Sequence, residues 1–220
     1  MDKKNVLIVS PHPDDMEIGM GGTVAKLLKD GVNVVSLVVT DGRRSTNIAN
    51  ISQEEMAKRR EHEAKRAARI LGIDNLILLG FPDIRTHDNR EKLKERLEEI
   101  LICLNPLEVF TTHPTIDKHP THRATSRVVL KTLRRIKGKL STHTVWFYEV
   151  WTPFEKYNRI EDISNEIAKK KAAIRAHRSQ IEYKDYIEGI IGLNRYRATF
   201  HNLNGVDTMK YAEVFIGLSI

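Results

Sequence analysis

NVLIVSPHPDDMEIGMGGT, residues 5–23, is the stretch of sequence that decides the fold. Its start, residues 5–10, is a continuous apolar run, which is typical of a strand buried on both faces. Pro11 and Pro13 end this strand. The acidic residues that follow predict the start of a helix, because carboxylates favour the positive end of the helix dipole. A strand that turns directly into a helix is the first unit of an α/β fold.

The same alternation continues along the chain. Further buried strands are predicted at 33–39, 75–79, 107–112 and 144–150. Helical patterns occupy the intervals, at 17–30, 53–71, 90–104 and 122–137. Ser52 and Glu55 form a capping-box pattern at the second helix, and Gly72 stands where that helix should end. Alternating strands and helices with short connections predict a doubly wound, Rossmann-like, mostly parallel sheet flanked by helices.

The last third of the chain differs in character. Residues 163–180 and part of 183–200 predict a helical extension, and 212–218 predicts a late strand at the edge of the sheet. The longest polar connection, residues 40–52, has the length of a loop that covers a site.

Chain length and composition bound the architecture. A length of 220 residues suits one domain, so we expect a single domain over 1–220, with an α/β core at 1–150 that carries the site and an extension at 151–220 packed on it. No run of eighteen apolar residues occurs, which predicts no membrane span. The only cysteine, Cys103, excludes an intrachain disulfide and fits a cytoplasmic location.

The net charge of +7 raises the question of an anionic partner. Lys and Arg alternate with Glu along the predicted helices, as on solvated helix faces. The one dense basic run, 131–139, lacks the aromatic residues of a single-strand binder. The glycines of Gly19-Met20-Gly21-Gly22 follow the strand–helix turn instead of forming it, so a dinucleotide fingerprint is weak. We therefore expect no nucleic-acid partner.

Chemistry concentrates first in the turn after the opening strand. His12 is followed by Asp14, Asp15 and Glu17 within six residues. A helix N-cap explains one of these carboxylates but not the whole group. A histidine and an aspartate three positions apart at a strand end can converge on one ion, and this donor set suits zinc or a similar divalent metal.

A second concentration follows the strand at 107–112. His113, His119 and His122 fall within ten residues, and such a cluster at the end of a buried strand favours a metal or catalytic site over structural histidines. A sheet of strand order 3-2-1-4-5 places the first and fourth strands side by side at its topological switch point, where ligands bind. The two clusters are therefore expected to face each other.

Three further polar residues lie on apolar helix stripes. Arg60 lies on the apolar face of the helix at 53–71, where its charge needs a partner. A structural salt bridge, or a side chain that reaches solvent, and a substrate-facing role explain it equally well. Lys171 and His177 share a stripe of the helix at 163–180. They are candidate site residues, but satisfied polar groups at a helix–sheet seam are the favoured explanation.

These motifs resemble the LmbE-like, or PIG-L-type, zinc-dependent N-deacetylase family. The chain matches the family's His-Pro-Asp-Asp-x-Glu segment at residues 12–17 and its Ile-Gly-x-Gly-Gly-Thr segment at 18–23. Residues 119–122, His-Pro-Thr-His, resemble its later His-x-Asp-His motif. The resemblance extends from about residue 5 to 180 and includes the helix around Arg60 and the late Lys…His-x-Ser-Gln segment.

The resemblance implies roles for individual residues. His12, Asp15 and His122 match the ligands of one zinc ion per chain. Asp14 matches the general base. His119 matches the group that protonates or stabilises the reacting amide, and Arg60 matches a substrate-side arginine.

Thr121 departs from the family pattern, because it replaces an aspartate that would orient His119. Asp117 and Glu17 are candidates to take over that task. Met16 replaces a common acidic residue, with little expected effect.

Two functions follow as expectations. The first is a cytoplasmic, zinc-dependent hydrolase that removes an N-acetyl group from an amino sugar or glycoconjugate by attack of a metal-activated water. The alternative, kept open by Thr121, is a non-catalytic metal- or sugar-binding protein on the same fold. The expected partner is a small N-acetylated amino sugar, and the resemblance also allows a homo-oligomer.

Overall fold

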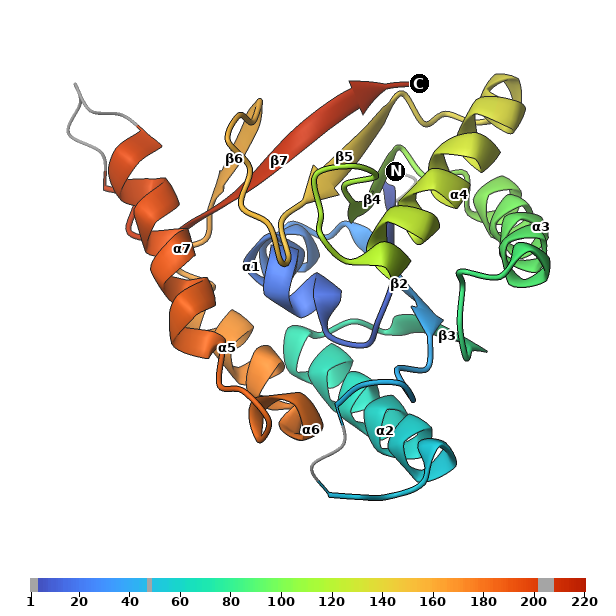
Figure 1. Ribbon diagram of the computed structural model, residues 1–220. Coiled ribbons are helices and arrows are strands. Elements are labelled where there is room, and N and C mark those ends of the chain that lie inside the picture. The colour runs from blue at the N-terminus through green and yellow to red at the C-terminus, as the bar shows by residue number, and fades with distance from the viewer. Residues whose placement is uncertain (1–3, 47–48, 202–207) are drawn as a thin grey trace.

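A seven-stranded sheet forms the centre of the computed structural model, which describes residues 4–46, 49–201 and 208–220 (Figure 1). The strand order is β3-β2-β1-β4-β5-β7-β6. The strands are β1 (Asn5–Ser10), β2 (Asn33–Thr40), β3 (Asn75–Phe81), β4 (Glu108–Thr112), β5 (Thr144–Tyr148), β6 (Arg159–Asp162) and β7 (Ala212–Ser219). β1 to β5 pair in parallel, and β7 is antiparallel to β5 and β6. The predicted mostly parallel sheet and its order 3-2-1-4-5 are confirmed.

Helices cover both faces of this sheet. They are α1 (Asp15–Lys29), α2 (Gln53–Leu71), α3 (His87–Leu104), α4 (Pro120–Ile136), α5 (Ile167–Arg175), α6 (Arg178–Ile181) and α7 (Ile187–His201), with a short 3₁₀ turn, η1 (Lys137–Lys139). Leu7 and Val9 of β1 pack in a core with α3 and α4, whereas Val6 and Ile8 pack in a core with α1, α2 and α5. This alternation follows from the two-residue period of a strand and explains the continuous apolar run. The doubly wound class is confirmed.

Local signals in the sequence correctly placed the second helix. Ser52 and Glu55 form the capping box of α2, and Gly72 ends that helix with a left-handed backbone conformation at φ 88°. Left-handed residues are common at helix C-termini because they redirect the chain after the last turn.

The C-terminal third differs from the prediction in two respects. The late strand joins the sheet, but β6, which was not predicted, takes the edge beyond β7. β6 is short and polar, so its sequence carries no strand pattern. The helix expected over 163–180 is broken at His177, whose ψ of 61° separates α5 from α6.

The glycines of the first helix allow close packing. A Cβ on Gly22 would lie 2.6 Å from the Cβ of Ile163, and Gly21 faces the side chain of Lys170. The backbone of α1 is kinked at Met20, which has φ −148° and ψ 22°. Lys170, rather than the predicted Lys171, is the buried lysine of α5. The prediction placed Lys171 on the buried stripe because it assumed one regular helix.

β1 and β4 are neighbours, so the loops after them meet at the carboxyl end of the sheet. No helix within the described part of the chain combines the length and apolar character needed to cross a membrane.

Candidate active site

The turn after β1 presents two carboxylates without using either as a helix cap. The backbone N–H groups of Asp14 and Asp15 donate to the His12 carbonyl at 3.0 and 3.4 Å, which closes a tight turn. Asp14 occupies the N-cap position of α1, yet its side chain makes no capping hydrogen bond. The Oδ2 atom of Asp15 instead accepts a 2.8 Å hydrogen bond from the His12 backbone N–H. Both carboxylates are therefore directed to other partners.

The loop after β4 supplies two histidines and a third carboxylate. Pro120 begins α4, so His122 lies in its first turn, fully buried. Asp117 bridges the loop: its Oδ1 accepts a 2.8 Å hydrogen bond from the His119 backbone N–H, and its Oδ2 lies 3.1 Å from His122 Nδ1. A carboxylate on the second ring nitrogen is the usual way to orient a metal-binding histidine. Asp117 thus orients His122, not the ring of His119.

The two loops converge on one point. Asp15 Oδ2 lies 3.1 Å from His12 Nδ1 and 3.2 Å from His122 Nε2, and these two nitrogens are 3.1 Å apart. Zinc bonds of 2.0–2.1 Å in tetrahedral geometry place neighbouring donor atoms about 3.3 Å apart, so this triangle has a suitable size. Imidazole and carboxylate are also donors that zinc accepts.

The electrostatics of the cluster favour positive charge at its centre. Burial alone would lower the pKa of His122, but the charges of Asp15 and Asp117 outweigh it and raise that pKa to about 10. Burial opposes ionisation of Asp15, yet His122 and His12 hold its pKa well below the ordinary value. The carboxylates therefore favour a cation, which a divalent metal ion supplies.

His119 lies beside this triangle. The donor atoms of His12, His119 and His122 all lie within 4.8 Å of one another, so the three histidines form a wider candidate metal group. The group formed by His12, His122 and Asp15 is more compact, because its donor atoms lie within 3.2 Å of one another. Burial, followed by the nearby rings of His12 and His122, lowers the pKa of His119 to about 4, so its ring is neutral at pH 7. Its buried Nδ1 has no hydrogen-bond partner among the described residues, and Thr121 does not replace the family aspartate in this respect.

Arg60 is the partner of Asp14. Its guanidinium is 2% exposed and donates at 2.9 Å both to Asp14 Oδ1 and to the Pro13 carbonyl. The hydroxyl of Tyr186 donates to Asp14 Oδ2 at 3.2 Å. Burial raises the pKa of Asp14, and the charge of Arg60 partly offsets this. The predicted salt bridge of Arg60 is therefore present, with Asp14 as its partner. The Arg60 side chain also borders the cleft.

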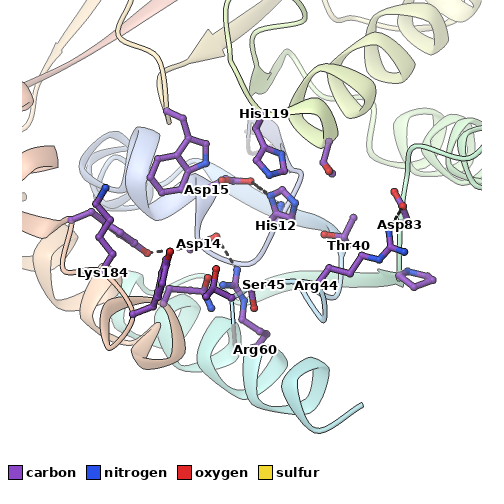
Figure 2. Close-up of a pocket in the computed structure, with 18 of the residues that line it drawn as sticks. His12, Asp14, Asp15, Thr40, Arg44, Ser45, Arg60, Asp83, His119 and Lys184 are labelled. Carbon is purple, nitrogen blue, oxygen red and sulfur yellow. Dashed lines mark hydrogen bonds and ion pairs between the residues drawn. The ribbon is translucent and has the colours of Figure 1, made fainter. Parts of the chain in front are cut away.

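A cleft of about 400 Å³ opens above these residues. Figure 2 shows His12 and His119 at its centre, with Arg44 and Asp83 on one side and Lys184 on the other. Residues 42 and 44–46 of the predicted site loop line it, and residues 47 and 48 of that loop lie outside the described part of the chain. Other lining residues come from the end of β2, the loop after β3, the start of α4, the loop after β5, α6 and the α6–α7 connection: Thr40, Pro82, Asp83, Arg85, Thr121, Trp151, Gln180, Tyr183, Lys184 and Tyr186.

Sequence reasoning missed several cleft residues and singled out others that lie elsewhere. Tyr186 and Trp151 carry no motif, and only the folded chain brings them to Asp14. His113 is structural, because its Nδ1 accepts the Thr115 and Ile116 backbone N–H groups. His177 is fully buried, with its Nε2 3.6 Å from Glu17, and does not line the cleft.

Comparison with known proteins decides the family. A family model described as GlcNAc-PI de-N-acetylase, PIG-L, matches residues 7–133, more than half of the chain. The chain belongs to the PIG-L family. The matched residues contain both loops of the candidate metal site. We call its residues the metal-site cluster: His12, Asp14, Asp15, His119 and His122.

Relatives of this PIG-L protein are deacetylases of N-acetylated sugars. Diacetylchitobiose deacetylase of Thermococcus kodakarensis is 36% identical over 81% of this chain and 71% of its own. A probable N-acetyl-alpha-D-glucosaminyl L-malate deacetylase 2 of Bacillus cereus is 30% identical over 82% of this chain and 85% of its own. The structure of N,N'-diacetylchitobiose deacetylase from Pyrococcus horikoshii superposes with a TM-score of 0.84 at 29% identity, covering 99% of this chain and 84% of that one.

Proposed function

We propose that this PIG-L protein is a zinc-dependent hydrolase that removes an N-acetyl group from an amino sugar or glycoconjugate. The observation that carries the proposal is the convergence of His12, Asp15 and His122 within 3.2 Å of one another, with Asp14 next to them at the floor of a cleft. The deacetylases related to this chain support the reaction type.

His12, Asp15 and His122 would hold one Zn²⁺ ion per chain. Three protein ligands are the composition of a catalytic zinc site, which keeps a position open, whereas structural sites use four. When bound there, zinc supplies Lewis-acid polarisation of the amide carbonyl and lowers the pKa of water to about 7. Asp117 keeps the ring of His122 oriented toward the ion.

The chain's own residues would handle the protons. Asp14 accepts a proton from the attacking water. Arg60 holds its Oδ1, and its Oδ2, which accepts one hydrogen bond from the Tyr186 hydroxyl, has a second acceptor site for the water. The protonated Asp14 then donates to the leaving amine. Acid–base assistance of this kind contributes roughly 10²–10⁴-fold to rates. Arg60 keeps Asp14 in place and acts on the substrate from the cleft wall.

His119 would stabilise the amide oxygen as that atom gains negative charge. As a neutral imidazole it offers one N–H donor, which suits a position beside a developing oxyanion. The lowered pKa favours this role over a permanently charged imidazolium.

The alternative function is non-catalytic binding of a metal or sugar. The unpartnered Nδ1 of His119 favours it, because a catalytic histidine is usually oriented by a second group. Release of acetate from an N-acetylglucosaminide would exclude this alternative.

The test is a set of N-acetylated sugars incubated with the zinc-loaded protein and scored by amine release. We expect release that is lost after chelation and restored by one zinc equivalent. His122→Ala should bind no stoichiometric zinc. A His122→Ala protein with unchanged zinc affinity, or a wild-type protein that binds no divalent ion, would contradict the site.

We also propose that residues 1–220 act as a single domain, because β7 of the C-terminal extension pairs with β5 of the core. The free thiol of Cys103 fits a reducing, cytoplasmic compartment.

A further inference from the structure

The composition of the cleft wall suits a polar ligand rather than an acyl chain. Among the described residues that line the cleft there is no leucine, isoleucine, valine, methionine or phenylalanine. A long acyl group gains its binding energy from burial against apolar side chains, which this wall lacks. The acyl group removed here is therefore small, and most of the cleft is left for the rest of the substrate.

Three aromatic residues line the cleft. Trp151 follows β5 and is 40% exposed, whereas Tyr183 and Tyr186 come from the connection between α6 and α7. Tyr183 is 56% exposed. Trp and Tyr combine an apolar ring with a polar tip, so they are suited to ligands that are apolar on one face and hydrogen-bonding at the rim.

Trp151 is fixed relative to the metal-site cluster by two contacts. Its ring packs edge-to-face on Tyr186, with centroids 5.7 Å apart, and the Tyr186 hydroxyl donates to Asp14. The next residue, Thr152, accepts a 3.1 Å hydrogen bond through Oγ1 from the backbone N–H of Lys118, which precedes His119. The indole is thus held at a defined place beside the residues that act on the amide.

The cleft also carries charge, and two of its arginines share one carboxylate. Asp83 accepts hydrogen bonds from both Arg44 and Arg85. An anionic substituent on the substrate would have to compete with this carboxylate for the two guanidinium groups. The aromatic residues of the lining, and not these charges, therefore favour a neutral ring over an acidic substituent.

We propose that Trp151 and Tyr183 form a subsite that stacks a second sugar ring of the substrate. This inference rests on the proposed deacetylase function and specifies its substrate class, an N-acetylated amino sugar linked to a neutral pyranose. The second ring packs its C–H face on the aromatic rings, and Gln180 and Lys184, which also line the cleft, are candidate partners for its hydroxyls.

The test compares kcat/KM for three substrates: N-acetylglucosamine, N,N'-diacetylchitobiose and N-acetylglucosaminyl malate. The wild-type protein should prefer the disaccharide to the other two. Trp151→Ala and Tyr183→Ala should each lower the disaccharide-to-monosaccharide ratio, by about fivefold to tenfold for Trp151, as expected for loss of one ring-stacking contact. Trp151→Phe should retain most of the preference.

Tyr196→Ala is the matched control, because Tyr196 is also 56% exposed but lies on α7 away from the cleft lining. It should leave the ratio unchanged. A wild-type preference for the malate glycoside, no preference for the disaccharide, or a preference that survives Trp151→Ala would overturn the subsite.

Calorimetric binding of the disaccharide that is deacetylated on its first ring only, so that the second ring stays neutral, separates this proposal from the deacetylase function. If no sugar is deacetylated but the disaccharide binds and Trp151→Ala weakens binding, the subsite stands and the proposed function fails. If hydrolysis occurs without any dependence on Trp151 or Tyr183, the proposed function stands and the subsite fails. If the disaccharide neither binds nor reacts, both are wrong.

Discussion

Two groups of ionisable residues lie against helix α1, and they are built in opposite ways. The first is the metal-site cluster at the start of α1. The second, which we call the seam pair, consists of Lys170 of α5 and Glu213 of β7. Glu213 accepts hydrogen bonds from Gly22 N, Thr23 N, Thr23 Oγ1 and Lys170 Nζ at 2.6–3.0 Å. The carboxylate of the seam pair is fully satisfied by the protein itself.

The metal-site cluster is satisfied only in part by the protein. Asp15 Oδ2 and two histidine nitrogens face one another around a common point, and the buried Nδ1 of His119 has no partner among the described residues. Three carboxylates, Asp14, Asp15 and Asp117, lie within this small region. Buried polar groups are normally satisfied, so donor atoms that converge without completing one another indicate a ligand site. The comparison separates a carboxylate that the protein satisfies completely from a cluster that has the features of a ligand site.

The largest loss of stability is expected when one member of the seam pair is removed. Glu213→Ala leaves the Lys170 ammonium buried without its partner and the N–H groups of Gly22 and Thr23 unsatisfied. Loss of one member of a buried ion pair typically costs about 3–5 kcal/mol, so the free energy of unfolding in urea should fall by that amount.

A double variant keeps this prediction testable if the single one does not fold. Lys170→Met combined with Glu213→Gln removes both charges and should recover most of the lost stability. A Glu213→Ala protein with wild-type stability would show that the seam pair does not hold α1 against α5 and β7.

The next largest effect is expected on the affinity for zinc, when the carboxylate beside Nδ1 of His122 is removed. Asp117→Asn keeps an Oδ1 acceptor for the His119 backbone but removes the carboxylate oxygen 3.1 Å from His122 Nδ1. Loss of such a carboxylate typically weakens metal binding about 10–100-fold. Competition with a chelating dye measures this affinity.

Asp162→Asn on β6 is the control for a change of one carboxylate, and it should bind zinc like the wild type. An Asp117→Asn protein with the same zinc affinity as this control would remove Asp117 from the metal site.

The smallest loss of stability is expected near the C-terminal end of α1. Lys26 of α1 pairs with Glu161 at 2.7 Å, but both side chains are partly exposed. Exposed ion pairs contribute about 0–1 kcal/mol, so Lys26→Ala should lower the free energy of unfolding by less than about 1 kcal/mol. A loss as large as that of Glu213→Ala would mean that burial does not distinguish the two pairs.

Sequence alone predicted the parallel half of the sheet and the meeting of the two metal-site loops. Apolar runs mark strands that are buried on both faces. The doubly wound strand order then places β1 next to β4. The late strand was placed at the sheet edge because β6 has no apolar pattern. The buried lysine was assigned one position too late because the predicted stripe was counted from Ile163, which precedes the first residue of α5.

The residues around Asp14 were harder to predict. Arg60 was recognised from its place on an apolar helix face, although its partner was left open. Tyr186 lies 172 positions from Asp14, in a polar connection without periodicity, so no local signal links the two. Trp151 reaches the cleft because β5 ends beside β4, which is a consequence of tertiary structure.

The most direct test of the central claim is the Asp14→Asn protein loaded with zinc. The substitution keeps the shape of the side chain and leaves His12, Asp15 and His122 intact, but it removes the proton acceptor. We expect one zinc per chain by metal analysis, and a kcat for amine release from an N-acetylated amino sugar reduced about 10²–10⁴-fold relative to the wild type. Turnover close to that of the wild type, with zinc bound, would contradict the account.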